Sequence, residues 1–175
     1  MRGNFNVKIF VSIVLIIALF MPTTAMAGLG SKKAAYIGGT TKSNVFPSAK
    51  INVVGRFTGD DQVLRFIPDK KNLPAHTIPY GQIIDIEYGQ KVGRRVGAAV
   101  ATTILISPIG LVMLFSKKRK HYVTIGFTDD NGIEQVSIFE LGKDLVRITL
   151  PYLKARSGKD IIYQDEEAKK LAGVG

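Results

Sequence analysis

The sequence predicts an α+β protein, mainly antiparallel β, with a C-terminal amphipathic helix and an inserted apolar helical hairpin. Three observations support this class. Apolar and polar residues alternate in short runs on both sides of an uncharged apolar stretch at residues 96–115. Turns rich in glycine and aspartate separate those runs, and apolar residues near the C-terminus recur at helical spacing.

The N-terminus has the three parts of a secretory signal peptide. Arg2 and Lys8 form a short positive region, residues 9–20 are apolar, and residues 25–27 match the small-x-small cleavage pattern. We therefore expect residues 1–27 to be a cleaved signal. The alternative is an uncleaved anchor.

Composition limits the partners. The chain has no cysteine, which excludes thiolate metal sites and redox-active thiols. Its net charge is +10, and removal of Arg2 and Lys8 with the signal would leave +8. A basic balance is compatible with binding to nucleic acid or to anionic membranes. Export and the apolar stretch favour anionic membrane lipid and argue against nucleic acid, although some of the charges could serve solubility alone.

Four regions follow the signal. Residues 28–48 are expected to be a flexible lead-in, a surface linker with room for one edge strand. Residues 49–163 would form a single domain, interrupted by an insert at residues 90–118. Residues 164–175 are a charged tail that we expect to fray.

Within the domain, residues 50–67 predict a hairpin that turns at residues 58–61, and residues 80–88 predict a further strand. A second hairpin is predicted over residues 121–139, because an Asn-Gly pair lies at the centre of its turn.

Residues 144–156 predict a helix that ends at Gly158. Pro151 removes a hydrogen bond from its interior, so the helix either kinks there or begins near Thr149. Residues 160–163 predict a short strand.

The apolar stretch has three interpretations. It is long enough for one membrane span, but Ser107–Gly110 contains a proline and a glycine that would break a helix. A helical hairpin turning there would keep the strands on both sides in one sheet. The third interpretation is a buried helix without a membrane.

Basic clusters flank the stretch, as expected for a segment that meets anionic headgroups. The residues predicted to contact the membrane are Arg94, Arg95, Lys117, Lys118, Arg119 and Lys120. A stripe of small residues, Gly93, Gly97 and Ala101, would allow close helix packing, either in self-association or between the arms of the hairpin. The alternative is coincidence in glycine- and alanine-rich sequence.

No catalytic, metal or cofactor-binding set is recognisable. His76 lies in a proline-flanked sequence that predicts a loop, and His121 follows the second basic cluster. His121 is expected to be a plain surface histidine; the alternatives are a pH sensor or a contact to lipid phosphate. The aspartate pairs at residues 60–61 and 129–130 lie in turn sequences, where aspartate is expected for backbone reasons. We therefore expect no enzyme activity and no cofactor.

Three stretches, IPYGQIIDIEYG (78–89), KKRKHYVTIGF (117–127) and LKARSG (153–158), resemble a bacterial pleckstrin-homology-like (GRAM-like) domain interrupted by an apolar insert. The chain is similar to an uncharacterised group of exported bacterial proteins. The resemblance implies a bent antiparallel sheet, capped by the C-terminal helix, that serves as a lipid- or protein-binding platform. Phosphoinositide-binding members place basic residues at the first hairpin turn, where residues 58–61 of this chain are acidic.

Together these observations predict a non-enzymatic, membrane-associated binding or scaffolding module at the periplasmic face of the bacterial envelope, anchored by the apolar insert and its basic flanks. Its expected partners are anionic membrane lipid and either a second protein or another copy of itself. The alternatives are an oligomeric membrane protein assembled through the small-residue stripe, or an envelope enzyme with an unrecognised site.

Overall fold

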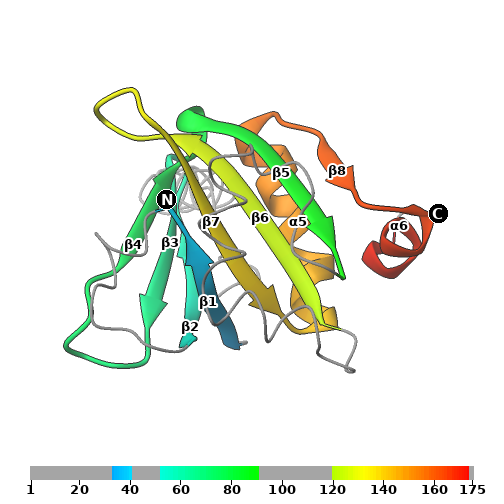
Figure 1. Ribbon diagram of the computed structural model, residues 1–175, viewed down its shortest axis with the longest axis horizontal. Coiled ribbons are helices and arrows are strands. Elements are labelled where there is room, and N and C mark those ends of the chain that lie inside the picture. Colours follow the sequence, from blue (N-terminus) through cyan, green and yellow to red (C-terminus); the bar gives the residue numbers. More distant parts are fainter. Residues whose placement is uncertain (1–32, 41–51, 91–119, 174–175) are drawn as a thin grey trace, which may run out of the picture.

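The computed structural model describes residues 33–40, 52–90 and 120–173. These residues form one mixed sheet of eight strands in the order β4-β3-β2-β1-β7-β6-β5-β8, with two α-helices (Figure 1). The elements are β1 (Lys33–Gly39), β2 (Val53–Gly59), β3 (Val63–Pro68), β4 (His76–Pro79), the 3-10 turn η2 (Tyr80–Gln82), β5 (Ile83–Gly89), β6 (His121–Thr128), β7 (Glu134–Leu141), α5 (Lys143–Ser157), β8 (Ile161–Tyr163) and α6 (Glu166–Ala172).

Two antiparallel meanders make up most of the sheet. One runs from β1 to β4 and the other from β5 to β7, and antiparallel pairing of β1 with β7 joins them. The short strand β8 follows α5 and pairs with the free edge of β5 in parallel. Both predicted hairpins are confirmed, since β2 pairs with β3 and β6 pairs with β7 across the expected turns.

The connection from β4 to β5 requires the sheet to be strongly curved. These strands lie six positions apart in the strand order, which corresponds to about 29 Å in a flat sheet with a strand spacing of about 4.8 Å. Only η2 connects them, and a link of this length reaches at most about 14 Å. The two meanders therefore fold toward each other, as Figure 1 shows.

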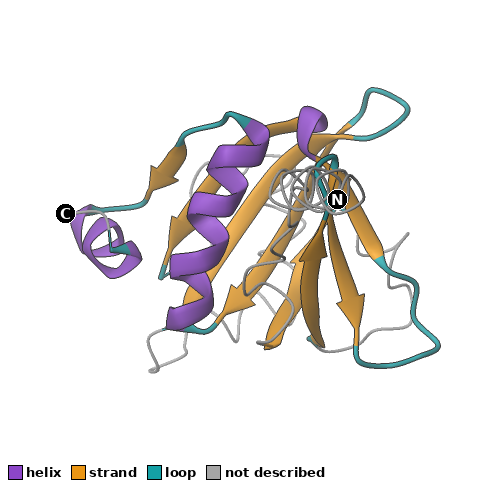
Figure 2. Ribbon diagram, turned by 180° about the vertical axis from the view of Figure 1, so that it is seen from behind, coloured by secondary structure: helices purple, strands orange, loops and turns teal. Residues whose placement is uncertain are grey.

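The concave side of the sheet holds an aromatic core. Tyr36, Phe57, Phe66 and Phe139 are at most 2% exposed, and their ring centroids lie 4.8–6.4 Å apart. Most of these ring pairs meet edge to face, the arrangement that aromatic quadrupoles favour. The helix α5 closes this core over the second meander (Figure 2), through the buried residues Leu145, Val146, Thr149, Leu150 and Leu153.

The predicted helix at residues 144–156 is confirmed as α5. It ends at Gly158, whose φ of 69° is left-handed and whose N–H donates to the carbonyl of Lys154. Pro151 lies inside the helix. The prediction that the helix begins near Thr149 is wrong, because the first helical residue is Lys143. The buried face of α5 compensates for the backbone hydrogen bond that Pro151 cannot donate.

The predicted fold class is wrong. The described residues form a mixed eight-stranded sheet with two short helices, rather than a bent antiparallel PH-like sheet with one helix and an apolar helical hairpin. Pairing of β8 with β5 makes the sheet mixed, because the chain returns from α5 to the sheet edge in the direction of β5. No apolar helical hairpin occurs in residues 33–40, 52–90 and 120–173; the segment predicted to form it lies outside these ranges.

Two flanking regions also differ from expectation. The lead-in at residues 28–48 contains β1, which is a central strand between β2 and β7 rather than an edge strand. The tail expected to fray contains the helix α6. Asp165 caps it, because its carboxylate accepts the Ala168 N–H at 2.7 Å, and Ala168 and Ala172 are buried.

Candidate functional site

The candidate site is a basic corner at the open end of the β5–β6 ladder. The last pair in this ladder is Gly89 with Tyr122, so Gln90 and Lys120 leave the sheet side by side. Because β6 also pairs with β7 from its first residue, the start of α5 lies at the same end of the sheet (Figure 1). We define the basic corner as Lys120, His121, Lys143 and Arg147.

His121 is held in place by Tyr88. The Tyr88 hydroxyl lies 2.7 Å from His121 Nδ1, and the two rings are stacked with centroids 6.0 Å apart. Burial, and then the positive charge of Lys143, lower the pKa of His121. The imidazole is therefore neutral at pH 7, and the charge of the corner comes from its lysine and arginine side chains.

The cationic side chains of the basic corner differ in their exposure and in their ion pairing. Lys120 forms an ion pair with Glu140 at 2.8 Å, in which both side chains are about one third exposed or less. Lys143 and Arg147 are exposed on the first turns of α5, and so is Asp144. The corner thus contains two exposed cations, one paired lysine and the carboxylates of Glu140 and Asp144.

Of the residues predicted to contact a membrane, the structure describes Lys120 alone. The other predicted contacts and the small-residue stripe lie outside the described residues: Arg94, Arg95, Lys117, Lys118, Arg119, Gly93, Gly97 and Ala101. Chain length still limits their distance from the corner. Arg95 follows Gln90 by five residues and Lys117 precedes Lys120 by three, which corresponds to at most about 18 Å and about 11 Å of extended chain.

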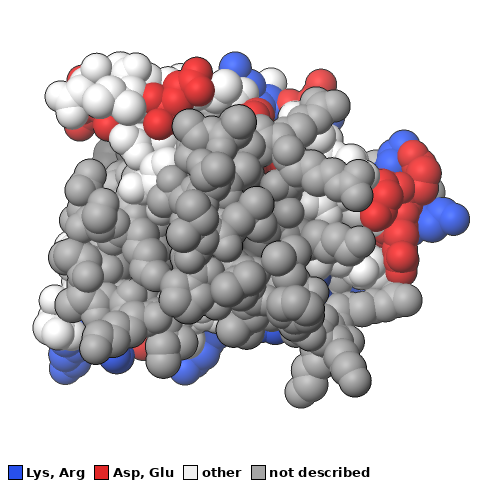
Figure 3. Space-filling view, in the orientation of Figure 1, with Lys and Arg blue, Asp and Glu red and all other residues white. Residues whose placement is uncertain are grey.

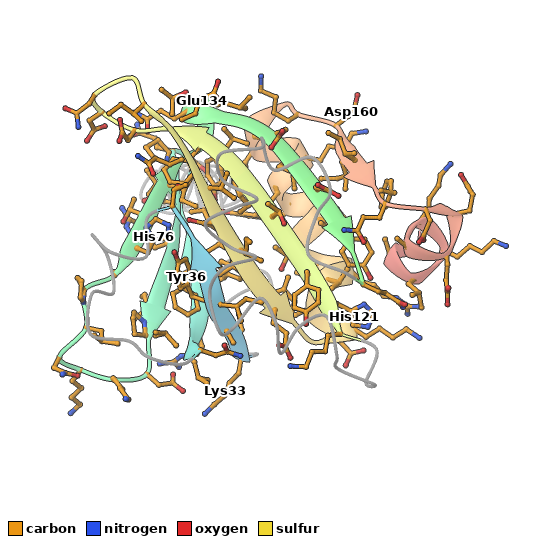
Figure 4. The ribbon with its side chains drawn as sticks, in the orientation of Figure 1. Lys33, Tyr36, His76, His121, Glu134 and Asp160 are labelled. Atoms are coloured by element: carbon orange, nitrogen blue, oxygen red, sulfur yellow. The ribbon has the colours of Figure 1, made fainter. Side chains whose placement is uncertain are left out.

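Figure 3 shows described basic side chains along the lower edge of the molecule and also at the top and the right. Acidic side chains lie at the upper left, over the turn between β6 and β7, and also at the right. Figure 4 places His121 and Lys33 at this lower edge and Glu134 at the opposite end.

Sequence reasoning missed a buried histidine–serine pair. His76 was expected in a loop, but it lies in β4, 5% exposed, and its Nε2 atom is 2.8 Å from Oγ of Ser137 in β7. A serine–histidine pair can provide a nucleophile and a base. Here aromatic rings of Tyr36, Phe127 and Phe139 surround the imidazole, and burial lowers its pKa to about 4. Such a histidine is a weak base, and Ser137 is 0% exposed, so this pair is part of the core. No local sequence signal identifies a partner 61 residues away.

The two aspartate turns have the backbone role that the sequence predicts. Asp60 Oδ1 accepts the N–H groups of Gln62 and Val63, both at 2.9 Å. These hydrogen bonds, together with Arg65, lower the pKa of Asp60 to about 2. Asp129 accepts the N–H groups of Asn131 and Ile133 in the same way.

The acidic turn between β2 and β3 is also tied to α5. The Tyr80 hydroxyl donates to the Tyr152 hydroxyl at 3.1 Å, and Tyr152 donates to the carbonyl of Asp60 at 3.2 Å. Arg156 forms an ion pair with Asp61 and stacks over the Tyr152 ring at 5.6 Å. The turn is therefore a fixed contact between the helix and the sheet.

Within residues 33–40, 52–90 and 120–173, no three histidine or acidic side chains gather in a way that could hold a metal ion. None of the helices described there has both the length and the apolar character that a membrane crossing needs. The prediction of a transmembrane protein is therefore wrong for this part of the chain, and residues 96–115 and the predicted signal at residues 1–27 lie outside it.

No known protein family, curated protein or solved structure matches the chain. The resemblance to GRAM-like domains consequently stays a prediction from the sequence, and the functional argument depends on the site itself.

Proposed function

We propose that the chain is a non-enzymatic binding module that docks on an anionic lipid surface through the basic corner. The observation that carries this proposal is the pairing of Gly89 with Tyr122, which makes both ends of the predicted insert leave the sheet together. The described residues at the two ends of the insert, Gln90 and Lys120, therefore lie at the same end of the sheet as Lys143 and Arg147, and the basic clusters are within five residues of them in the sequence.

This arrangement suits a charged surface better than a small ligand. Each lysine or arginine near an anionic bilayer contributes about 1 kcal/mol of binding, and the contributions of clustered cations combine. Lys143 and Arg147 are exposed. No ion pair is described for either side chain, so a contact with headgroups would not replace a contact within the described part of the protein. The contact needs headgroups at the surface and does not require any segment to cross the bilayer.

The test is sedimentation of the full chain with vesicles. We expect binding to vesicles that contain phosphatidylglycerol, weaker binding at high salt because the charges are screened, and no binding to pure phosphatidylcholine. The double variant Lys143→Glu, Arg147→Glu should weaken binding at least about tenfold, since it removes two cations worth about 1 kcal/mol each. The matched control is Lys159→Glu, Lys170→Glu, which makes the same change in net charge at exposed positions outside the corner.

Equal loss of binding in both double variants would show that only net charge matters, and would refute the assignment of the corner. Binding that is unchanged by the corner variant would refute it as well. Assembly through the small-residue stripe and a location at the periplasmic face of the envelope both stay predictions, because they depend on residues outside the described ranges.

A further inference from the structure

Two neighbouring apolar side chains are exposed on the outer face of the sheet, the face opposite the aromatic core. Val54 in β2 is 44% exposed and Ile67 in β3 is 42% exposed. The residues before them, Val53 and Phe66, belong to the core, and successive side chains of a strand point to opposite faces. Ile67 pairs with Arg56 across the β2–β3 ladder. Val54 precedes Arg56 by two residues, so it is the diagonal neighbour of Ile67, about 7–8 Å away.

This pair differs from isolated apolar residues on a protein surface. Within the described residues the exposed large apolar side chains are Val54, Ile67, Ile84 and Ile133, and the first two share one face of one hairpin. Single exposed apolar side chains are ordinary, whereas neighbouring ones form a common apolar surface that leaves water only when a partner covers it. We call Val54 and Ile67 the apolar pair.

Cationic side chains lie beside the apolar pair. Lys33 pairs with Arg56 across the β1–β2 ladder, and Arg56 pairs with Ile67, so the three side chains form one row on the outer face. Both cations use the carboxylate of Asp69: Lys33 Nζ lies 3.0 Å from Oδ2 and Arg56 Nε lies 4.0 Å from Oδ1. Two cations with one carboxylate leave an excess of positive charge. Their side chains are 72% and 57% exposed, and such ion pairs are weak, so both cations are available to an anionic partner.

The register of the sheet connects the apolar pair to the basic corner. Val54 pairs with Ala35 in β1, and Ala35 pairs with Glu140 in β7. Val54 therefore lies two strand spacings, about 10 Å, from Glu140. The carboxylate of Glu140 binds Lys120 of the basic corner at 2.8 Å. Figure 4 accordingly shows Lys33 and His121 at the same edge of the molecule. A surface that meets the basic corner thus extends to the apolar pair.

A lipid surface has the chemistry that this arrangement requires, because an anionic headgroup layer covers an apolar layer. Long cationic side chains keep their charge among the headgroups while neighbouring apolar side chains reach deeper. We propose that the outer face of β1–β3 is a second contact with the lipid surface, in which Val54 and Ile67 enter the boundary between headgroups and acyl chains beside Lys33 and Arg56. This inference rests on the proposed lipid contact of the basic corner, and it adds an apolar contribution to an electrostatic one.

Tryptophan fluorescence of the full chain tests the contact. The chain contains no tryptophan, so a single introduced tryptophan reports on one position. With vesicles that contain phosphatidylglycerol, Ile67→Trp should shift its emission to shorter wavelength, and lipids with brominated acyl chains should quench it. The control is Ile133→Trp, at an isoleucine that is 58% exposed in the β6–β7 turn, and its emission should stay that of a tryptophan in water. Sedimentation with the same vesicles is measured in parallel.

The outcomes separate this inference from the proposed function. Sedimentation without a spectral shift in Ile67→Trp would overturn the inference and leave the basic corner in place. Equal shifts at both positions would overturn it too, because the contact would then not be specific to the outer face. A shift without vesicles that grows with protein concentration would show that a second copy of the chain covers the apolar pair. Absence of sedimentation would overturn both proposals.

A second variant excludes an effect of the added tryptophan. Val54→Ser with Ile67→Ser removes apolar surface and leaves every charge in place. At raised salt, where the charges are screened, it should bind vesicles at least about tenfold more weakly than the unaltered chain. The matched control, Ile84→Ser with Ile133→Ser, changes apolar side chains that are 41% and 58% exposed elsewhere on the molecule, and it should bind like the unaltered chain. Equal binding of the two double variants would refute the inference.

Discussion

His76 Nε2 and Ser137 Oγ lie 2.8 Å apart across the interior of the sheet, although their strands, β4 and β7, are four positions apart in the strand order. Only a strongly curved sheet brings these strands into contact. The pair therefore reports directly on the closure of the two meanders around the core.

The buried imidazole makes stability depend on pH. The pKa of His76 is lowered from 6.5 to about 4 by burial, so between these pH values the unfolded chain binds a proton that the folded protein does not. Above pH 6.5 the imidazole is neutral in both states and does not change the free energy of unfolding. As the pH falls from 6.5 toward 4 the folded protein loses stability, and the loss reaches about 3 kcal/mol near pH 4.

Urea unfolding at pH 7.5 and pH 4.5 measures this loss. His76→Phe should remove most of the difference between the two pH values, whatever its absolute stability. His121→Phe provides a matched control at the partly exposed histidine of the basic corner, and it should leave most of the difference in place. A variant at His76 with the original pH dependence would contradict the assignment.

Gly59 is required by the contact between the acidic turn and α5. A Cβ atom at this position would lie 2.6 Å from the Tyr80 hydroxyl and 2.8 Å from the Tyr152 hydroxyl, which are hydrogen-bonded to each other. We expect Gly59→Ala to reduce the free energy of unfolding by about 1–3 kcal/mol, through overpacking and loss of that hydrogen bond.

The control is Gly81→Ala, because no atom lies within 4 Å of a Cβ atom built at Gly81. It should change stability by no more than about 0.5 kcal/mol in the same denaturation experiment. Equal effects of the two substitutions would show that crowding at the tyrosine pair is not the cause.

Pro151 limits the stability of α5. It lies in the interior of the helix and is exposed, so Pro151→Ala would restore an N–H donor to the backbone without disturbing the core. Proline in a helix interior costs about 3 kcal/mol, and its stiffening of the unfolded chain offsets up to about 1 kcal/mol. We expect the variant to unfold at a higher urea concentration, with a gain of about 1–2 kcal/mol.

Pro74→Ala is the comparison, since Pro74 is exposed in the loop between β3 and β4. It should be neutral or slightly destabilising, because only the stiffening of the unfolded chain is lost. A loss of stability in Pro151→Ala would mean that the helix depends on the fixed φ angle of proline at this position.

Sequence reasoning predicted the elements whose interacting residues are close together in the chain, and it missed the pairings between residues that are far apart in the chain. The two hairpins and α5 were predicted correctly because their signals are local: aspartate turns, an Asn-Gly pair and a terminal glycine. The position of β1 was missed, because its pairing with β7 joins residues about 100 positions apart and its own sequence, KAAYIGG, is rich in glycine and alanine. The fold-class prediction failed for the same reason, since nothing near residues 161–163 indicates parallel pairing with β5.

The site was predicted only in part. The sequence indicated basic residues on both sides of the insert, and the β5–β6 register brings together the two described residues that flank it, Gln90 and Lys120. The contributions of Lys143 and Arg147 were missed, because on sequence grounds they are ordinary polar positions of an amphipathic helix. The pairing of Lys120 with Glu140 was also missed, since it depends on β6–β7 register.

The helix α6 had a local signal that the charged composition of the tail obscured. Asp165 accepts the Ala168 N–H at 2.7 Å, Glu166 and Glu167 lie in the first turn, and Gly173 ends the helix with a φ of 83°. Capping aspartate, acidic first turn and terminal glycine are the expected markers of a short helix.

Asp165→Ala should destabilise α6 by about 1 kcal/mol. The measurement is hydrogen exchange at the Ala168 amide, whose protection should fall about fivefold or more. Glu166→Ala removes the same charge from the first turn without removing the cap, and it should leave that protection nearly unchanged. If both variants exchange alike, the charge of the first turn rather than the cap bond holds α6 against the core.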